Sequence, residues 1–201
     1  MKLIRHRRNT LQELAETPRQ YGVEVDIRSQ GNRLVMHHDP YVEGESFDEW
    51  VAAYRHGTLI LNVKEEGLEA RLIELMAKHG IEDYFFLDQS FPFMVKWYAA
   101  AAGRSAVRVS EFESIETALT LAGKVKWVWV DCFTKFPLSG EQARTLQAAG
   151  LQLCLVSPEL QQRDAETEIP QMRALLASLG ISPEAVCTKR PDLWEGELDR
   201  A

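Results

Sequence analysis

Two histidines and two carboxylates in the first forty residues have a spacing that indicates a reactive site. Glu24 and Asp26 stand two apart in an apolar, β-branched stretch, so both side chains project from one face of a strand. Paired carboxylates on a buried strand are costly unless a cation or hydrogen-bond donors compensate them. His6 follows one apolar run and the adjacent pair His37 and His38 follows another, and only one of that pair can point toward the carboxylates. Two imidazoles beside a metal ion would supply proton transfer. The pattern therefore predicts a metal site flanked by two histidines.

Eight short apolar or β-branched runs predict the strands that position these residues. They cover residues 2–5, 23–27, 58–63, 84–87, 106–109, 127–130, 151–156 and 185–187. Stretches with helical period lie between several of them, at residues 68–78, 114–122, 141–149 and 169–179. Strands that alternate with helices predict a parallel sheet, and eight such units suit a compact (β/α)8 barrel. An open doubly wound sheet is the alternative, but no glycine-rich phosphate loop follows the first strand.

Residues 34–36 predict one further strand, paired with residues 23–27 through a turn at Gly31 and Asn32. No linker, low-complexity tract or sequence repeat interrupts the chain. We therefore expect residues 1–201 to form a single α/β domain. The expected fold is a compact (β/α)8 TIM-type barrel with an extra hairpin strand after its second strand.

Composition excludes several classes of function. The net charge is −7 and the basic residues are scattered apart from a cluster at residues 5–8, which argues against nucleic-acid binding. No window approaches the length of a membrane span, and the N-terminus lacks the apolar stretch of a signal peptide. The three cysteines lie in apolar runs without a CxxC pair, so we expect reduced thiols in a cytoplasmic protein.

Polar side chains occur where nearly every predicted strand stops, at the end of a barrel that carries active sites. The set comprises His6 and Arg7, Glu24 and Asp26, Lys64, Asp88, Arg108 and Glu111, Asp131, Ser157 and Glu159, and Thr188 and Lys189. A single such residue is usually a solvated loop side chain, but their recurrence predicts a polar site at one mouth of the barrel. Substrate contacts are expected from Asp88, Glu111, Asp131 and Glu159. Structural hydrogen bonds are the alternative for Asp88 and Asp131.

The ordered motifs resemble those of the glycerophosphodiester phosphodiesterases, a family within the phospholipase-C-like phosphodiesterase superfamily of (β/α)8 barrels. The resemblance rests on His6-Arg7, Glu24-x-Asp26, the extra strand before His38-Asp39, and Lys64 at the end of the third strand. Later segments, at residues 86–90, 129–133 and 156–160, resemble a divergent small bacterial subgroup of the same superfamily.

The resemblance implies metal-assisted cleavage of a phosphodiester, often with an adjacent substrate hydroxyl as the internal nucleophile. It implies general acid and base roles for His6 and His38, phosphate contact by Arg7, and stabilisation of phosphoryl charge by Lys64. A metal and two cations would neutralise developing negative charge, while the imidazoles would move protons. The implied substrate is a small phosphorylated metabolite of the glycerophosphodiester type.

The resemblance also implies a divalent metal ion, Mg²⁺ or Ca²⁺, held by Glu24 and Asp26. Two positions depart from the family pattern: Arg8 replaces a glycine, and Asn62 replaces the carboxylate that would be the third ligand. A neutral amide binds these cations more weakly than a carboxylate. Either Glu24, Asp26 and Asn62 suffice, or metal binding has weakened and the activity has changed. A nearby acid could also complete the shell, the candidates being Glu65, Asp88 and Glu111.

Two functions from other classes remain open. Lys64 could form a Schiff base with a carbonyl substrate, as in a barrel lyase. Alternatively, the chain could be a non-catalytic barrel that binds a phosphate ester without metal, which Asn62 suggests. The sequence favours a metal-dependent phosphodiester hydrolase or lyase over both.

Overall fold

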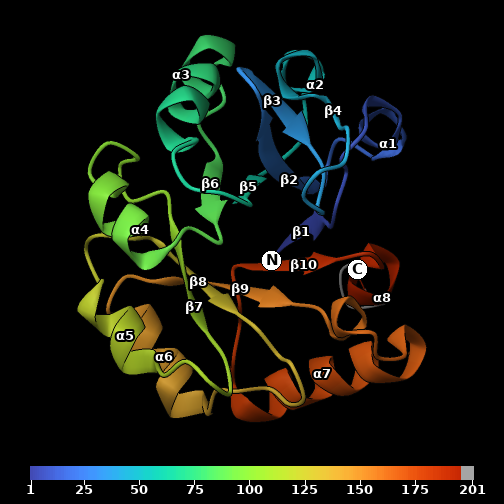
Figure 1. Cartoon of the computed structure of the whole chain (residues 1–201). Coiled ribbons are helices and arrows are strands. Elements are labelled where there is room, and N and C mark those ends of the chain that lie inside the picture. Colours follow the sequence, from blue (N-terminus) through green and yellow to red (C-terminus); the bar gives the residue numbers. More distant parts are fainter. Residues whose placement is uncertain (196–201) are drawn as a thin grey trace. The chain divides into compact units, whose positions relative to one another are not determined.

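The computed structural model describes residues 1–195, in which strands alternate with helices through most of the chain (Figure 1). The chain divides into two compact units. Among the described residues, unit 1 contains Met1–Arg5 and residues 107–195, and unit 2 contains His6–Ala106. Unit 2 is therefore inserted between two segments of unit 1.

Unit 2 is built on a parallel set of strands extended by an antiparallel edge (Figure 1). Strand β2 pairs parallel with β5, and β5 pairs parallel with β6. On its other side β2 pairs antiparallel with β3, which pairs antiparallel with β4. The elements are α1 (Leu11–Glu16), β2 (Gly22–Gln30), β3 (Arg33–Met36), β4 (Glu45–Ser46), α2 (Phe47–Ala53), β5 (Leu59–Val63), α3 (Glu69–His79), β6 (Tyr84–Leu87) and α4 (Phe91–Trp97).

Alternation along β2 separates the core of unit 2 from the site. The apolar residues of β2, such as Val25, belong to a buried cluster that includes Trp50 of α2 and Leu72 of α3. Fully burying a side chain of this kind contributes about 1.5–3 kcal/mol. Because successive side chains of a strand point to opposite faces, this packing turns Glu24 and Asp26 to the other face of the sheet.

Local capping sets where the helices of unit 2 begin and end. At α1 the Thr10 hydroxyl accepts the Glu13 backbone N–H, and the Glu13 carboxylate accepts the Thr10 backbone N–H, both at 3.1 Å. This reciprocal pair satisfies two backbone donors that the first turn leaves free. At the C-terminal end of α3, Gly80 takes φ 65°, a left-handed conformation that glycine adopts without steric cost. The Thr10–Glu13 pair also fixes the start of α1, next to the short segment that crosses β2.

Unit 1 contains a second parallel set, in the order β1-β10-β9-β8-β7. Its strands are largely buried, and its helices connect successive strands (Figure 1). The elements are β1 (Lys2–Arg5), β7 (Ala106–Val109), α5 (Ile115–Thr120), β8 (Trp127–Val130), α6 (Gly140–Ala148), β9 (Gln152–Val156), the 3₁₀ helix η1 (Pro158–Gln161), α7 (Ala165–Leu179), β10 (Ala185–Thr188) and α8 (Pro191–Glu195).

The eight predicted strands are all present, with bounds that differ by a few residues. Helices α1, α2, α4 and α8 were not predicted, because short amphipathic segments carry little periodicity. Across residues 1–195, no helix has the length and apolar character needed to cross a membrane. The mixed α/β class is confirmed, while the closed single barrel and the single domain stay predictions.

Candidate functional site in unit 2

The register between β2 and β5 builds the centre of the site. Asp26 lies directly opposite Asn62 in this parallel pair, and Glu24 lies opposite Ile60. The backbone N–H of Lys64 continues the ladder by donating to the Ile27 carbonyl at 3.0 Å. Glu24, Asp26 and Asn62 are 1%, 0% and 6% exposed, so their polar groups depend on protein partners. The sequence therefore concentrates two buried carboxylates and an amide on one face.

Glu24 is held mainly by hydrogen-bond donors. Its Oε2 accepts the backbone N–H of Arg7 at 2.7 Å, and its Oε1 accepts the Asn62 side-chain N–H at 2.8 Å. The Nε2 atom of His6 lies 3.9 Å from Glu24 Oε2. The backbone N–H of Arg8 also donates to the Glu24 carbonyl at 2.9 Å. The segment after β1 is thus anchored across β2, with His6 beside a buried carboxylate.

The pKa of Glu24 is raised to about 7, mainly by burial and next by the neighbouring negative charge of Asp26. The hydrogen bonds from Asn62 and Arg7 and the charge of Lys64 act in the opposite direction. A carboxyl that titrates near neutrality can hold or release a proton, and a nearby cation would favour its charged form. Perturbation of this kind is concentrated at functional sites.

Asp26 is held mainly by cations and by one asparagine. The Asn9 amide donates to Asp26 Oδ2 at 2.9 Å, and Asn9 Oδ1 accepts the Asp26 backbone N–H at the same distance. The Arg7 guanidinium lies 3.5 Å from Oδ2, and the Lys64 ammonium lies 3.2 Å from Oδ1. These two cations offset the charge of a fully buried carboxylate.

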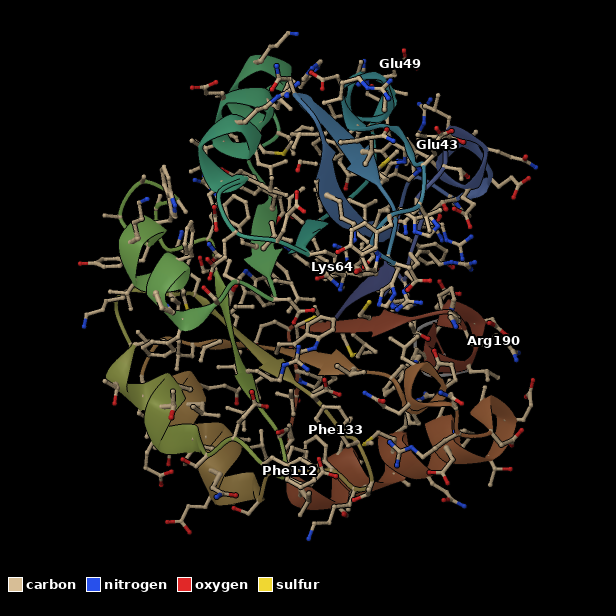
Figure 2. All side chains as sticks on the ribbon, in the orientation of Figure 1. Glu43, Glu49, Lys64, Phe112, Phe133 and Arg190 are labelled. Atoms are coloured by element: carbon tan, nitrogen blue, oxygen red, sulfur yellow. The ribbon has the colours of Figure 1, made fainter. Side chains whose placement is uncertain are left out.

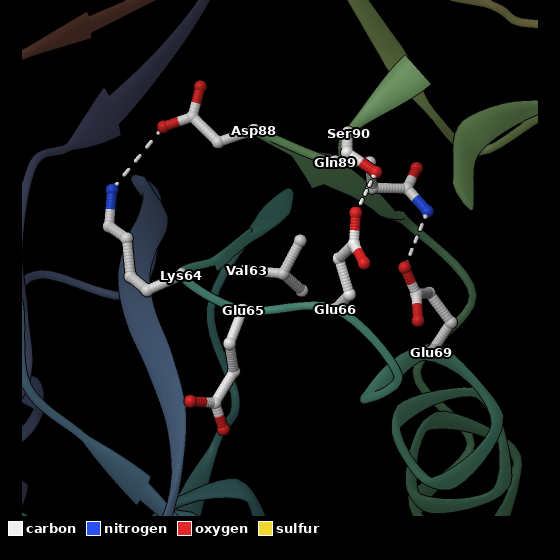
Figure 3. Close-up of a pocket in the computed structure, with 8 residues that line it drawn as sticks. All are labelled: Val63, Lys64, Glu65, Glu66, Glu69, Asp88, Gln89 and Ser90. Atoms are coloured by element: carbon white, nitrogen blue, oxygen red, sulfur yellow. Dashed lines mark hydrogen bonds and ion pairs between the residues drawn. The ribbon is translucent and has the colours of Figure 1, made fainter. Parts of the chain in front are cut away.

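Lys64 is shared between two carboxylates, Asp26 and Asp88, and Figure 3 shows its contact with Asp88. Its Nζ lies 3.2 Å from Asp26 and 3.3 Å from Asp88, and its side chain is 14% exposed. Asp88 directly follows β6 and takes φ 60°, a left-handed conformation that is uncommon for residues other than glycine. Such conformations persist where surrounding contacts hold them, and here the conformation accompanies a carboxylate directed at Lys64.

A cavity of about 320 Å³ lies beside this ion pair (Figure 3). Its lining includes Lys64, Glu65, Glu66, Asp88 and Ser90. Glu66 accepts a hydrogen bond from the Ser90 hydroxyl, and Glu65 accepts the backbone N–H of Ser29 at 2.5 Å. Carboxylates outnumber cations in the lining, so groups that donate hydrogen bonds are the complementary ligands.

His38 forms a dyad with its sequence neighbour Asp39. Its Nδ1 donates to Asp39 Oδ1 at 2.8 Å, and this hydrogen bond lowers the pKa of Asp39. A carboxylate on one imidazole nitrogen fixes the ring and leaves the other nitrogen for proton transfer. His37 differs, because its Nδ1 accepts the backbone N–H of Asp39 at 3.0 Å.

The donor set fits a hard divalent cation only if Asn62 takes part. Among residues 1–195, no group of three or more His, Cys, Asp or Glu side chains could hold a metal ion. Asn62 Oδ1, however, is buried and accepts no hydrogen bond from any described residue. An amide oxygen beside two carboxylates is a suitable ligand for Mg²⁺ or Ca²⁺. Glu24, Asp26 and Asn62 are therefore compatible with such an ion.

The other predicted substrate contacts lie in unit 1, where each carboxylate has protein partners. Asp131 accepts from Arg108 and from Gln161, both at 2.7 Å. Glu159 accepts from the Thr188 hydroxyl at 2.6 Å and from the backbone N–H of Lys189 at 2.8 Å. These contacts organise the ends of the strands, and substrate binding by the residues stays a prediction.

Glu111 ties together two loops of unit 1. It accepts the backbone N–H groups of Phe133, Thr134 and Lys135 at 3.2, 2.6 and 2.7 Å. The loops that Glu111 joins carry Phe112 and Phe133, whose rings lie 5.9 Å apart (Figure 2). Glu111 also accepts the Thr134 hydroxyl at 2.9 Å, so its observed contacts are with one loop, as expected for a residue that fixes loop conformation.

In unit 2 the structure brings together most residues singled out from sequence: His6, Arg7, Glu24, Asp26, Asn62, Lys64 and Asp88. Two further residues take part without having been predicted, Asn9 on Asp26 and Arg28 on the backbone of His38. Asn9 has no distinguishing sequence pattern. Arg28 does continue the alternation of Glu24 and Asp26, and that period could have indicated it.

No protein-family model matches the chain, and no curated protein sequence matches it. Solved structures do match. A glycerophosphodiester phosphodiesterase from Agrobacterium tumefaciens is 14% identical, with 96% of this chain and 98% of that chain covered at TM-score 0.65. A glycerophosphoryl diester phosphodiesterase from Parabacteroides distasonis is also 14% identical, with 96% and 84% covered at TM-score 0.67.

A weaker likeness extends to tryptophan synthase. The α-subunit from Pyrococcus furiosus is 11% identical, with 93% of this chain and 86% of that chain covered at TM-score 0.56. At such identities a structural match establishes the fold and leaves the activity open. The resemblance found in the sequence is confirmed at that level: the chain has the α/β fold seen in glycerophosphodiester phosphodiesterases.

Proposed function

We propose that the chain is a metal-dependent phosphodiester hydrolase or lyase that acts on a small phosphorylated metabolite. The observation that carries this proposal is the buried Glu24–Asp26 pair, with Arg7 and Lys64 on Asp26 and His6 beside Glu24. Carboxylates, two cations and an imidazole in contact form a set that can bind and cleave a phosphate ester. The fold seen in glycerophosphodiester phosphodiesterases supports the same assignment.

In this proposal the two histidines move the protons. One imidazole removes a proton from the attacking hydroxyl, of water or of the substrate itself, and the other protonates the leaving alcohol as its bond to phosphorus breaks. His38 is suited to this exchange because Asp39 orients its ring through Nδ1. His6 is held beside Glu24, whose raised pKa provides a neighbouring group that can share a proton.

Charged side chains would stabilise the phosphoryl oxygens. The Arg7 side chain is 43% exposed while its guanidinium remains 3.5 Å from Asp26, so it can reach an incoming phosphate. Lys64 supplies a second, less exposed positive charge. Preorganised charges of this kind act where negative charge develops in the transition state.

Glu24, Asp26 and Asn62 would hold the divalent cation, Mg²⁺ or Ca²⁺. When bound, such an ion polarises the phosphoryl group and helps to neutralise its charge. Lys64 meanwhile keeps Asp26 paired, which reduces the repulsion between the two carboxylates. We further propose that the strands of the chain close into one (β/α)8 barrel, as the strand count and the fold suggest.

The experiment is a turnover assay of the purified chain with Mg²⁺ or Ca²⁺ on glycerophosphodiesters and on bis(p-nitrophenyl) phosphate. Phosphorus NMR of the products separates hydrolysis, which yields a monoester, from attack by a substrate hydroxyl, which yields a cyclic phosphate. We expect turnover that disappears with chelator and falls by roughly 10²–10⁴ in His6→Ala. Turnover in wild type that His6→Ala and His38→Ala both leave unchanged would overturn the mechanism.

One alternative also has support from a specific observation. Asn62 supplies a neutral amide, and Lys64 already occupies Asp26 as a cation, so Arg7 and Lys64 could bind a phosphate ester without metal or catalysis. Calorimetry that shows metal-independent binding of glycerol phosphate, together with no turnover, would select this function. A Schiff-base lyase is less compatible, because the Lys64 Nζ that would attack a carbonyl is already held by Asp26 and Asp88.

A further inference from the structure

Arg28 makes an unusual set of contacts at the end of β2. Its Nε and Nη2 atoms both donate to the carbonyl oxygen of His38, at 3.1 and 2.8 Å. Its Nη1 lies 3.5 Å from the carbonyl oxygen of Lys64. One side chain therefore contacts the backbone of two chain segments. One segment carries His38, a proposed proton donor or acceptor, and the other carries Lys64, proposed to bind the phosphate.

The charge of Arg28 is not used in an ion pair. Within residues 1–195, no carboxylate lies within ion-pair distance of its partly buried guanidinium. Arginine is usually retained for bidentate contact with carboxylate or phosphate, whereas this one is directed at carbonyl oxygens. Its contacts are with backbone carbonyl oxygens and thus fix backbone position.

The backbone at His38 needs such support. Strand β3 ends at Met36, so the sheet ladder no longer holds the peptide groups of residues 37–43. The loop then returns tightly, because a side chain at Gly44 would collide with the Met36 carbonyl oxygen. Between these points, two hydrogen bonds from Arg28 hold the carbonyl of His38. This carbonyl belongs to the peptide group that joins His38 to Asp39, the two residues of the dyad.

We propose that Arg28 is a positioning residue that fixes the His38 loop relative to the end of β5, so that the imidazole of His38 and the ammonium of Lys64 act on one phosphate. This inference rests on the proposed function, because it assigns the positioning to the same reaction. Displacement of a reacting group by about 1 Å can lower a rate by roughly 10²-fold. Arg28 accordingly acts on the chemical step through the backbone and touches no substrate.

The test compares Arg28→Met and Arg28→Lys with Arg33→Met as the matched control. Arg33 is exposed on β3 of the same antiparallel pair, and its guanidinium donates to the Gln30 side chain at 2.9 Å. Two quantities are measured: kcat and KM on a phosphodiester, and hydrogen–deuterium exchange of the backbone amides of residues 38–43. The exchange measurement does not depend on activity.

For Arg28→Met we expect kcat to fall roughly tenfold to a hundredfold, with KM within about threefold of wild type, because a positioning residue affects the transition state more than binding. Exchange in residues 38–43 should become faster. Arg28→Lys should recover part of kcat, since an ammonium can donate to one carbonyl but cannot bridge both. Arg33→Met should match wild type in both measurements.

Unchanged exchange and unchanged kcat in Arg28→Met would overturn the positioning role. So would a fall in kcat that Arg33→Met reproduces, because that effect would be a general loss of the antiparallel edge. A wild-type chain without phosphodiesterase activity would overturn the proposed function and this inference with it. If the wild type is active and Arg28→Met leaves hydrogen–deuterium exchange in residues 38–43 unchanged, this inference alone is overturned.

Discussion

Asp26 and Asn62 lie directly opposite each other on parallel strands β2 and β5, and the Asn62 amide donates to Glu24 rather than to Asp26. The amide oxygen of Asn62 is consequently buried without a hydrogen bond from any described residue. Neutral Asn62 thereby satisfies one carboxylate while it presents an unused oxygen beside the other. A divalent cation would be favourable between the Asn62 oxygen and the two carboxylates.

Replacement of Asn62 by aspartate should test that arrangement. Asn62→Asp removes the donor to Glu24 and places a third carboxylate in the cluster, so the metal-free protein should melt at a lower temperature than wild type. Ca²⁺ or Mg²⁺ should raise the melting temperature of the variant more than that of wild type, because three carboxylates bind these ions more tightly. Differential scanning calorimetry with and without each ion measures both effects.

The control is Asn32→Asp, which makes the same change of charge in an exposed turn. Its melting temperature should respond to the ions as wild type does. Equal responses of Asn62→Asp and Asn32→Asp would contradict a metal site at Asn62.

The two adjacent histidines should differ in their effect on turnover. His38→Ala removes the ring that Asp39 orients, and we expect kcat to fall by roughly 10²–10⁴. His37→Ala should lower kcat by less than about tenfold, because the hydrogen bonds that the described residues give His37 are with the Asp39 backbone. Steady-state kinetics of both variants decides the assignment, and a larger loss in His37→Ala would reverse it.

Lys64 should contribute to stability as well as to function. Lys64→Met removes a cation from a fully buried carboxylate, and we expect the free energy of unfolding to fall by about 1–3 kcal/mol. Asp26 keeps its contacts to Asn9 and Arg7, which limits the loss. Urea unfolding measures the change, with Lys78→Met as the control.

Lys78 is exposed on α3, so loss of its charge should change stability by no more than about 0.5 kcal/mol. An unaltered free energy of unfolding in Lys64→Met would show that the ion pairs at Asp26 and Asp88 contribute nothing to stability.

Trapping of a carbonyl substrate on Lys64 by borohydride would instead support the Schiff-base alternative.

Stability should depend on pH through Glu111. Burial raises its pKa, but hydrogen bonds from the backbone N–H groups of Lys135 and Thr134 outweigh this and lower it to about 2, from an ordinary value of 4.5. A depressed pKa means that the stabilisation is fully present above the ordinary value and is lost as pH falls toward the folded value. Glu111→Gln should therefore cost about 1 kcal/mol at neutral pH, as loss of a helix cap does.

The difference between Glu111→Gln and wild type should shrink as pH falls from about 5 to about 2, because protonation removes the same charge from wild type. Urea unfolding at several pH values measures it. A difference that is constant over this range would show that the carboxylate charge is not what holds the Phe133 loop.

The two units should unfold together if the chain is one domain. Trp50 and Trp97 report on unit 2, and Trp127, Trp129 and Trp194 report on unit 1. Variants that keep only one of these tryptophan sets, with phenylalanine elsewhere, should each show coincident urea midpoints by fluorescence and by circular dichroism. Separate midpoints for the two sets would show two independently stable domains.

The sequence by itself determined the strands and the residues that follow them. Alternation placed Glu24 and Asp26 on one face, and the apolar runs located all eight predicted strands, because strand period and burial are local properties of sequence. The order of His6, the carboxylates and His38 was enough to indicate the resemblance that the fold bears out. Lys64 was also recognised from its position at the end of the third predicted strand, and its ion pairs are with Asp26 and Asp88.

Only the tertiary structure decided which partners these residues have. The donation from Asn62 to Glu24 depends on strand register, and the contact of Asn9 with Asp26 depends on how a loop crosses β2. The sequence alone could place Arg28 on the same face of β2 as Glu24 and Asp26. Its hydrogen bonds to the His38 carbonyl, however, depend on where the β3–β4 loop returns. Hydrogen bonds are short and directional, so contacts between residues distant in sequence follow from three-dimensional placement and not from residue type.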